Sequence, residues 1–264
     1  MFLIKGNRLI LNGNKLALRS KKSDNRYYTD EYTNYKYMTI VALEDDLTVQ
    51  VSRDIQYCVD CDENWITLTA NTPTQSIKSG QTLSFKCNTT TFGGVFSGIN
   101  KNCNLSGNCM SLLYGDDTNP DNTLSQASFQ GLFSNCTTIK NVSKNFLPCV
   151  NLNTACYVGM FANCTSLVTA PELPATTLEI SCYNQMFMNC SSLVTVPELP
   201  AATLKMSCYF SMFANCTSLV TAPELPAATL VDNCYNQMFM NCSSLNYIKM
   251  LATNNISIGS SLWV

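Results

Sequence analysis

The pattern of apolar and polar positions repeats with a fixed period through the second half of the chain. Runs that open with Cys-Tyr restart every 26 residues, at Cys156, Cys182, Cys208 and Cys234, and a degenerate earlier copy begins at Ser128. Copies one and three share MFANCTSLVTAPELPA, whereas copies two and four share CYNQMFMNCSSL, which indicates that a 52-residue pair was duplicated. So regular a period predicts a repeat architecture.

The first part of each unit has the spacing of a short helix. In the second copy the apolar residues fall at helical intervals, with polar residues off their stripe: Cys182, Tyr183, Met186, Phe187 and Cys190. This pattern predicts a helix of about two turns that ends in the turn-forming sequence Asn-Cys-Ser.

The rest of each unit is expected to be extended. The β-branched run 192–196 predicts a short strand, and Pro197 and Pro200 predict an extended corner before Leu204 returns to the core. One helix, one strand and one corner describe a solenoid coil. A single coil cannot bury its own apolar face, so neighbouring coils should stack at about 4.8 Å. Near-identity of the coils predicts uniform exposed rows, such as Thr169, Thr195 and Thr221.

The N-terminal part of the chain has a different pattern. Residues 1–19 alternate apolar and polar positions in three short runs, and Asn12-Gly13 is typical of a hairpin turn. Three strands of this length are too small to stand alone, so we expect them to dock as an anchor, either on the next domain or on another protein. Residues 20–37 are polar and rich in tyrosine, and we expect a linker there.

Between the linker and the repeats lies a strand-rich region. From 38 to 112, runs of strand-forming residues are separated by turn residues every 8 to 15 positions, which predicts a small β-sandwich. Residues 113–127 are then a connecting loop, and 128–264 form the solenoid. We therefore expect a multidomain protein with a small β-strand arm, a β-sandwich and an α/β solenoid with 26-residue coils.

Composition narrows the functional classes. Charged residues make up only 13% of the chain, the formal net charge is −2, and the sequence contains no histidine. The lack of histidine removes Ser-His-Asp and Cys-His nucleophile systems, histidine-ligated metals and imidazole proton shuttles. So few cations argue against nucleic-acid binding. No segment reaches 18 consecutive apolar residues, so membrane insertion is not expected.

The 15 cysteines have two explanations. Cys58 and Cys61 have the spacing of half a zinc site, which Cys87, Cys103 and Cys109 could complete. The separation of Cys103 and Cys109 is too wide for the second half, which favours an incidental thiol pair or a disulfide. The repeat cysteines occupy the same place in every coil, which indicates small buried residues in a ladder rather than reactive thiols.

No other residues stand out as a site. Asp116, Asp117, Asn119 and Asp121 offer oxygen ligands for calcium, but no glycine-centred loop of about twelve residues follows, which favours an ordinary acidic loop. The acidic run 44–46 indicates a solvated turn, the Met-Phe pairs indicate core, and no carboxylate pair suggests glycoside hydrolysis. We predict no catalytic, cofactor-binding or metal-binding residue and no cofactor, and the ligand-binding residues stay undefined.

The repeat unit resembles the BspA-like branch of leucine-rich repeats, the cysteine-containing type found in surface proteins of oral and gut anaerobes. The resemblance is carried by Met-Phe-x-Asn-Cys-x-Ser-Leu, as at 186–193, and by the following Pro-x-Leu-Pro, as at 197–200. It covers about half the chain, from roughly 128 to 251. A 26-residue period is longer than that of common members of the family. Family members usually carry a secretion signal, and the start Met1–Arg8 does not have that pattern.

These features lead us to expect a non-enzymatic structural protein of a bacteriophage virion, assembled in the cytoplasm of a gut anaerobe. It would be a fibre or appendage component that binds other virion proteins through residues 1–19 and presents its repeats for contact with a host-surface glycan or protein. The resemblance to such appendages implies a homo-oligomer, with a trimer favoured, and an exposed Trp263 on the last coil would favour association. The alternatives are a BspA-like adhesin of the bacterial cell surface and, third, a carbohydrate-active enzyme.

Overall fold

The computed structural model describes residues 8–12, 15–19, 35–61, 63–92 and 95–260. The chain divides into two compact units, 1–32 and 33–264. In the first unit, strands β1 (Arg8–Asn12) and β2 (Lys15–Arg19) pair antiparallel, with Leu9 opposite Leu18. These are the second and third of the three predicted N-terminal runs. The first run, most of the predicted linker and Trp263 lie outside the described residues.

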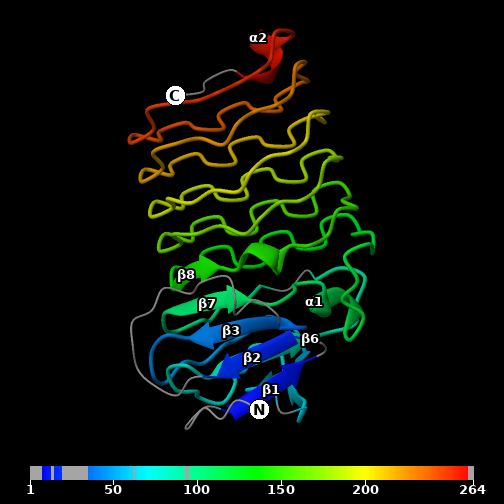
Figure 1. Ribbon diagram of the computed structural model, residues 1–264, viewed down its shortest axis with the longest axis vertical. Coiled ribbons are helices and arrows are strands. Elements are labelled where there is room, and N and C mark those ends of the chain that lie inside the picture. The colour runs from blue at the N-terminus through cyan, green and yellow to red at the C-terminus, as the bar shows by residue number, and fades with distance from the viewer. Residues whose placement is uncertain (1–7, 13–14, 20–34, 62, 93–94, 261–264) are drawn as a thin grey trace. The chain divides into compact units, whose positions relative to one another are not determined.

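The second unit begins with a six-stranded mixed sheet (Figure 1). Its strands are β3 (Met38–Ala42), β4 (Ile55–Val59), β5 (Ile66–Leu68), β6 (Thr82–Lys86), β7 (Cys103–Ser106) and β8 (Ile139–Val142). The spatial order is β5-β4-β6-β3-β7-β8. All neighbouring pairs are antiparallel except β7 and β8, which are parallel. Thus the last strand of the sheet comes from the first predicted repeat.

The β-sandwich predicted for 38–112 is replaced by this single sheet. The run at 47–51 forms only isolated bridges, Leu47 with Ile77 and Gln50 with Pro73, so the described residues of 38–112 form no second sheet. Irregular chain covers the apolar face instead, and the ring of Phe96 packs edge-on against that of Phe85 with centroids 5.2 Å apart. Strand periodicity predicts that the sheet has one apolar face, but it does not distinguish a second sheet from irregular chain as the cover of that face.

A short helix and one close backbone approach hold the chain after β7 against the sheet. Helix α1 (Ser111–Tyr114) places the buried hydroxyl of Ser111 so that it donates to the carbonyl of Phe85 at 2.8 Å and accepts from the amide of Met38 at 2.9 Å. At Gly107 a Cβ atom would lie 1.9 Å from the carbonyl oxygen of Tyr37, so only glycine fits there. The 3₁₀ turn η2 (Lys144–Phe146) and helix α2 (Ile256–Gly259) are the remaining helical elements described.

The repeats stack as coils above the sheet, and between 147 and 255 the described chain contains neither helix nor strand (Figure 1). The predicted two-turn helix is wrong. In the coil that starts at Cys182, left-handed residues recur every four positions, with φ of 55° at Ser181, 55° at Gln185 and 63° at Asn189. A right-handed α-helix cannot contain such residues. The segment is instead a ribbon of overlapping turns, which we call the turn ribbon (residues 181–190 and their equivalents in each coil).

Hydrogen bonds in the turn ribbon alternate between two directions. Amides at even positions close local turns, as from Met186 to the carbonyl of Tyr183 at 3.3 Å. Amides at odd positions bond to the next coil, as from Phe187 to the carbonyl of Met212 at 2.9 Å. From 181 to 190 every backbone amide donates and every carbonyl accepts. Because buried backbone groups must be paired, this arrangement lets the ribbon pack against its neighbours without helix or sheet.

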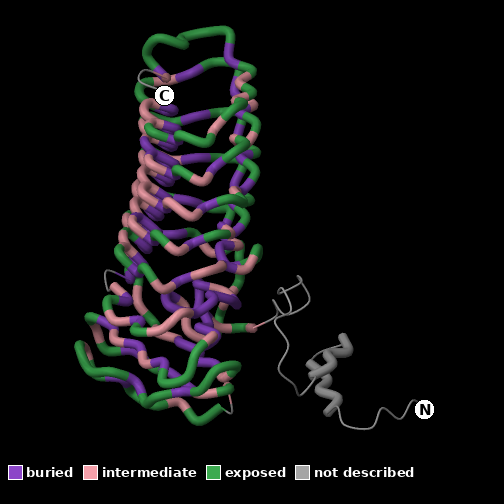
Figure 2. Tube along the Cα trace, turned by 90° about the vertical axis from the view of Figure 1, so that its left-hand side faces the viewer, coloured by how far each residue is buried: buried purple, intermediate pink, exposed green. Residues whose placement is uncertain are grey.

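The expected strand of each coil is also shorter than predicted. Within 192–196 only Thr195 forms a bridge, a parallel one to Thr169 of the preceding coil. On the neighbouring stretch of the coil, Thr203 forms a single parallel bridge to Thr177. Around every coil, buried residues alternate with exposed ones (Figure 2). The 26-residue repeat is therefore confirmed, whereas the α/β description of its coil is wrong for the described residues.

The stack of coils begins inside the sheet region. The amide of Phe92 donates to the carbonyl of Ser128 at 2.9 Å, and that of Phe96 donates to Leu132 at 3.0 Å. These are the bonds that one turn ribbon makes to the next. The predicted limits 37/38, 112/113 and 127/128 all fall within the compact unit 33–264.

Side-chain contacts confirm that Phe96 belongs to a partial coil. Its carbonyl accepts from the thiol of Cys136 at 2.8 Å, as the carbonyl of Phe133 accepts from Cys164 at 3.2 Å one coil later. The rings of Phe96 and Phe133 lie 5.1 Å apart. The partial coil at Phe92 and Phe96, which lies within the sheet region, thereby covers the first turn ribbon (residues 127–136).

Candidate functional site

Identical side chains form continuous rows through the interior of the coils. Tyrosine rings stack with centroids 5.7 to 5.8 Å apart, along Tyr157, Tyr183, Tyr209 and Tyr235. Phenylalanine rings stack at 5.5 to 5.8 Å, along Phe133, Phe161, Phe187, Phe213 and Phe239. Near-parallel stacking of this kind leaves no open space between coils for a ligand, so the Met-Phe pairs are core, as predicted.

The repeat cysteines are buried, which confirms the ladder prediction. The thiol of Cys190 donates to the carbonyl of Phe161 at 3.1 Å, and that of Cys216 donates to Phe187 at 3.2 Å. Burial raises the pKa of Cys190 to about 12 and that of Cys242 to about 11. Since the thiolate is the nucleophile, these cysteines are unreactive in the folded protein.

None of the five cysteines considered for a zinc site takes part in a disulfide. Cys58, Cys103 and Cys109 are buried, whereas Cys61 and Cys87 are half-buried. Among the described residues, no group of three or more Cys, Asp or Glu side chains is placed to hold a metal ion. No disulfide joins Cys58 and Cys61.

The acidic loop at 116–121 is used for contacts within the protein. A carboxylate oxygen of Asp116 accepts from the hydroxyl of Tyr37 at 2.6 Å, and Lys86 donates to both carboxylate oxygens at 3.2 Å. These donors hold the pKa of Asp116 below its usual range, with the tyrosine hydrogen bond as the largest cause. Asp117 accepts from the amide of Asn119 at 3.3 Å.

An aromatic and charged cluster surrounds Asp116. The ring of Tyr37 meets that of Trp65 edge-on with centroids 4.8 Å apart, and the ammonium of Lys86 lies 4.3 Å from the centre of Trp65. Burial and the bond to Asp116 raise the pKa of Tyr37. Sequence reasoning missed this cluster because its members are far apart in the chain. The members of this cluster contact one another, and these contacts hold the start of β3 against the loop at 116–121.

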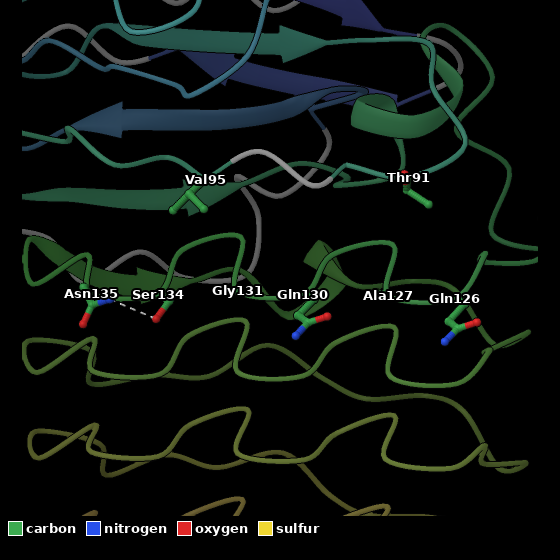
Figure 3. Close-up of a pocket in the computed structure, with 8 residues that line it drawn as sticks. All are labelled: Thr91, Val95, Gln126, Ala127, Gln130, Gly131, Ser134 and Asn135. Carbon is green, nitrogen blue, oxygen red and sulfur yellow. Dashed lines mark hydrogen bonds between the residues drawn. The ribbon is translucent and has the colours of Figure 1, made fainter.

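A shallow groove with a volume of about 620 Å³ is present on the described surface (Figure 3). It lies on the outer face of the first turn ribbon, and its lining residues are Thr91, Val95, Gln126, Ala127, Gln130, Gly131, Ser134 and Asn135. None of these residues carries a charge. Gly131, whose φ is 65°, contributes no side chain to the groove.

Hydrogen-bonding side chains recur every four residues along this groove, at Gln126, Gln130 and Ser134. The exposed amides of the two glutamines make no hydrogen bond to another described residue. The amide of Asn135 donates to Ser134 at 3.2 Å (Figure 3). Free amides can donate and accept together, so the groove suits a neutral polar ligand rich in hydroxyl groups. No signal in the sequence pointed to it, because glutamine is common on exposed surfaces.

Comparisons with protein-family models, with curated proteins and with solved structures find no match to this chain. No helix among the described residues is long and apolar enough to cross a membrane.

Proposed function

We propose that the protein is a non-enzymatic structural component of a bacteriophage virion, a fibre or appendage that is anchored by its N-terminus and presents its coils to the host surface. The observation that carries the proposal is the continuous stack of coils, paired at its start with the sheet region and extending to α2. Rows of stacked rings and paired amides make such a stack stiff. A stiff stack suits a part that must hold a contact surface away from its anchor.

The groove on the first turn ribbon is the candidate contact site for a host glycan. Its support is chemical: it is uncharged, and Gln126 and Gln130 leave their amides free to bind hydroxyl groups. Substituting both glutamines by alanine should abolish binding to a neutral host polysaccharide on a glycan array. The matched control replaces Asn184 and Asn236, which lie in later turn ribbons away from the groove. Equal loss in both variants would contradict a glycan site in the groove.

The virion assignment is tested by fractionating a lysate of the producing culture on a density gradient and locating the protein by mass spectrometry. We expect it to sediment with intact particles at a fixed ratio to capsid protein. Recovery only with the host envelope would overturn this assignment and favour the second candidate, a BspA-like adhesin of the bacterial surface. Turnover of a host polysaccharide by purified protein would favour the third candidate, a carbohydrate-active enzyme.

A further inference from the structure

One side of the coils presents a regular, uncharged row of apolar side chains. Val168, Val194 and Val220 are exposed by 38%, 54% and 46% at equivalent positions of three successive coils. We call this surface the Val-Thr face, defined by residues 165–169, 191–195 and 217–221.

Backbone contacts hold these valines in line. The amide of Val194 donates to the carbonyl of Val168 at 3.0 Å, and the amide of Val168 donates to Lys140 at 2.8 Å. The amide of Asn246 donates to Val220 at 3.2 Å. The 26-residue repeat places Val220 one coil beyond Val194, so the apolar row spans three coils, and the polar residues Lys140 and Asn246 bound it. Exposed threonines at 165, 195, 217 and 221 flank it.

Charge distinguishes this face from the neighbouring stretch of each coil. Residues 163–171, 189–197 and 215–223 contain no charged side chain. The next stretch carries one exposed glutamate in each coil, at Glu172, Glu198 and Glu224. Two copies that met through this acidic row would bring like charges together, whereas two Val-Thr faces meet without repulsion.

The turn ribbon is also uncharged, but its described large apolar side chains are buried or half-buried. Among the described residues, Ile180 and Met206 are also exposed at equivalent positions, but they adjoin Glu179 and Lys205, whereas the Val-Thr face has an apolar row of three residues without charge. Because every coil presents the same residues at the same spacing, a second copy offers a matching surface along the whole row.

We propose that the Val-Thr face is the surface through which copies of this chain associate side by side. The occupant is a second copy of the chain, and burial of the valine rows drives the association. The inference goes beyond the proposed function and does not depend on it.

The valines at these positions also have a local explanation, the backbone preference of the stretch, and an experiment can separate it from association between copies. Valine is a β-branched residue that suits the extended, bridge-forming backbone of this stretch. Threonine has the same branching and nearly the same shape, and it already follows each valine in the sequence. Replacing the three valines by threonine therefore keeps the backbone preference and removes the apolar row.

The test is sedimentation velocity of the full chain over a wide range of concentration. We expect an oligomer for the natural sequence, a monomer for Val194→Lys/Val220→Lys, and a dissociation constant raised by about tenfold or more for the triple threonine variant. The control Thr203→Lys/Thr229→Lys places the same charges at exposed threonines of the neighbouring stretch and should leave the oligomer intact. The triple threonine variant decides the outcome if the lysine variant does not fold. A monomeric natural protein, or an oligomer that survives all face variants, overturns the proposal.

Discussion

The side-chain amide of Asn189 donates from Nδ2 to Oδ1 of Asn163 at 2.6 Å, and both residues have a left-handed backbone, with φ of 63° and 64°. The same bond joins Asn215 to Asn189 at 2.7 Å and Asn241 to Asn215 at 2.8 Å. Asparagine tolerates positive φ better than most residues, so one side chain both permits the turn and ties neighbouring coils together. This double role explains why Asn precedes the second cysteine of every coil.

Substitution of Asn189 separates the two roles. Asn189→Ala removes the side-chain hydrogen bonds to Asn163 and Asn215. It also leaves a residue with a Cβ atom at positive φ without a compensating hydrogen bond. Together these effects should lower the unfolding free energy by about 2–4 kcal/mol. Asn189→Gly relieves the backbone and loses only the bonds, so it should cost less, about 1–2 kcal/mol. Urea unfolding followed by circular dichroism measures both. A glycine variant as unstable as the alanine variant would show that backbone conformation is not limiting.

A buried hydroxyl without a partner gives a second prediction. The hydroxyl of Tyr157 is buried and makes no hydrogen bond to any described residue, although its ring stacks on those of Phe129 and Tyr183. Tyr157→Phe keeps the stacking and removes the unpaired group, so we expect it to raise the unfolding free energy by about 1 kcal/mol. The comparison is Tyr183→Phe in the same denaturation assay, since the hydroxyl of Tyr183 is not among the buried unpaired groups. A loss of stability on Tyr157→Phe would contradict the absence of a partner.

Stability should fall steeply at alkaline pH. Burial raises the pKa of Cys136, Cys156 and Cys190 to about 12, above the ordinary thiol value near 9. Below pH 9 these thiols hold their proton in both folded and unfolded chains and contribute no pH dependence. Between about pH 9 and 12 the unfolded chain releases protons that the folded chain retains, so each such thiol lowers stability by about 1.4 kcal/mol per pH unit.

The measurement is urea unfolding at a series of pH values from neutral to alkaline. Cys190→Ala removes one buried thiol and should make the decline less steep, although it lowers stability at neutral pH by leaving a small cavity. Val168→Ala, which removes no thiol and lies at an exposed position, should leave the decline steeper than Cys190→Ala does. Equal slopes for both variants would show that the repeat thiols do not cause the alkaline loss.

The repeat could be predicted from the sequence, but the conformation of its coil could not. Cys182-Tyr183, Met186-Phe187 and Cys190 recur every four residues, close enough to the period of 3.6 to suggest a helix. The distinguishing signal lies between them, at positions 181, 185 and 189, where the structure has positive φ. Asparagine at 189 suggests such a backbone, but serine at 181 and glutamine at 185 do not, so the local signal is weak.

The start of the coil stack was missed for a different reason. Thr91-Phe92 and Phe96-Ser97 match the spacing of Ser128-Phe129 and Phe133-Ser134, but this partial copy is 37 residues from the next one rather than 26. A search for a fixed period does not find it. The cluster of Tyr37 and Asp116 joins residues 79 positions apart, and no local pattern encodes such a contact.

The packing of Phe96 predicts that the sheet and the coils unfold together. Its buried ring lies between Phe85 of the sheet, at 5.2 Å, and Phe133 of the first coil, at 5.1 Å. Phe96→Ala should cost about 3–5 kcal/mol, because it removes a large buried ring from the contact between the two parts. In a Trp263→Phe background, fluorescence of Trp65 reports on the sheet, and near-ultraviolet circular dichroism of the stacked tyrosine row reports mainly on the coils.

Coincident urea transitions by the two probes are expected for the parent protein, since a single cooperative unit unfolds in one step. Phe96→Ala should separate them, with the sheet lost first, because the coils keep their own rows of stacked rings whereas the sheet loses the aromatic layer on its apolar face. Val150→Ala removes an exposed apolar side chain and should leave the transitions coincident. Separate transitions already in the parent would show that the shared backbone ladder at Phe92 and Phe96 does not couple the two parts.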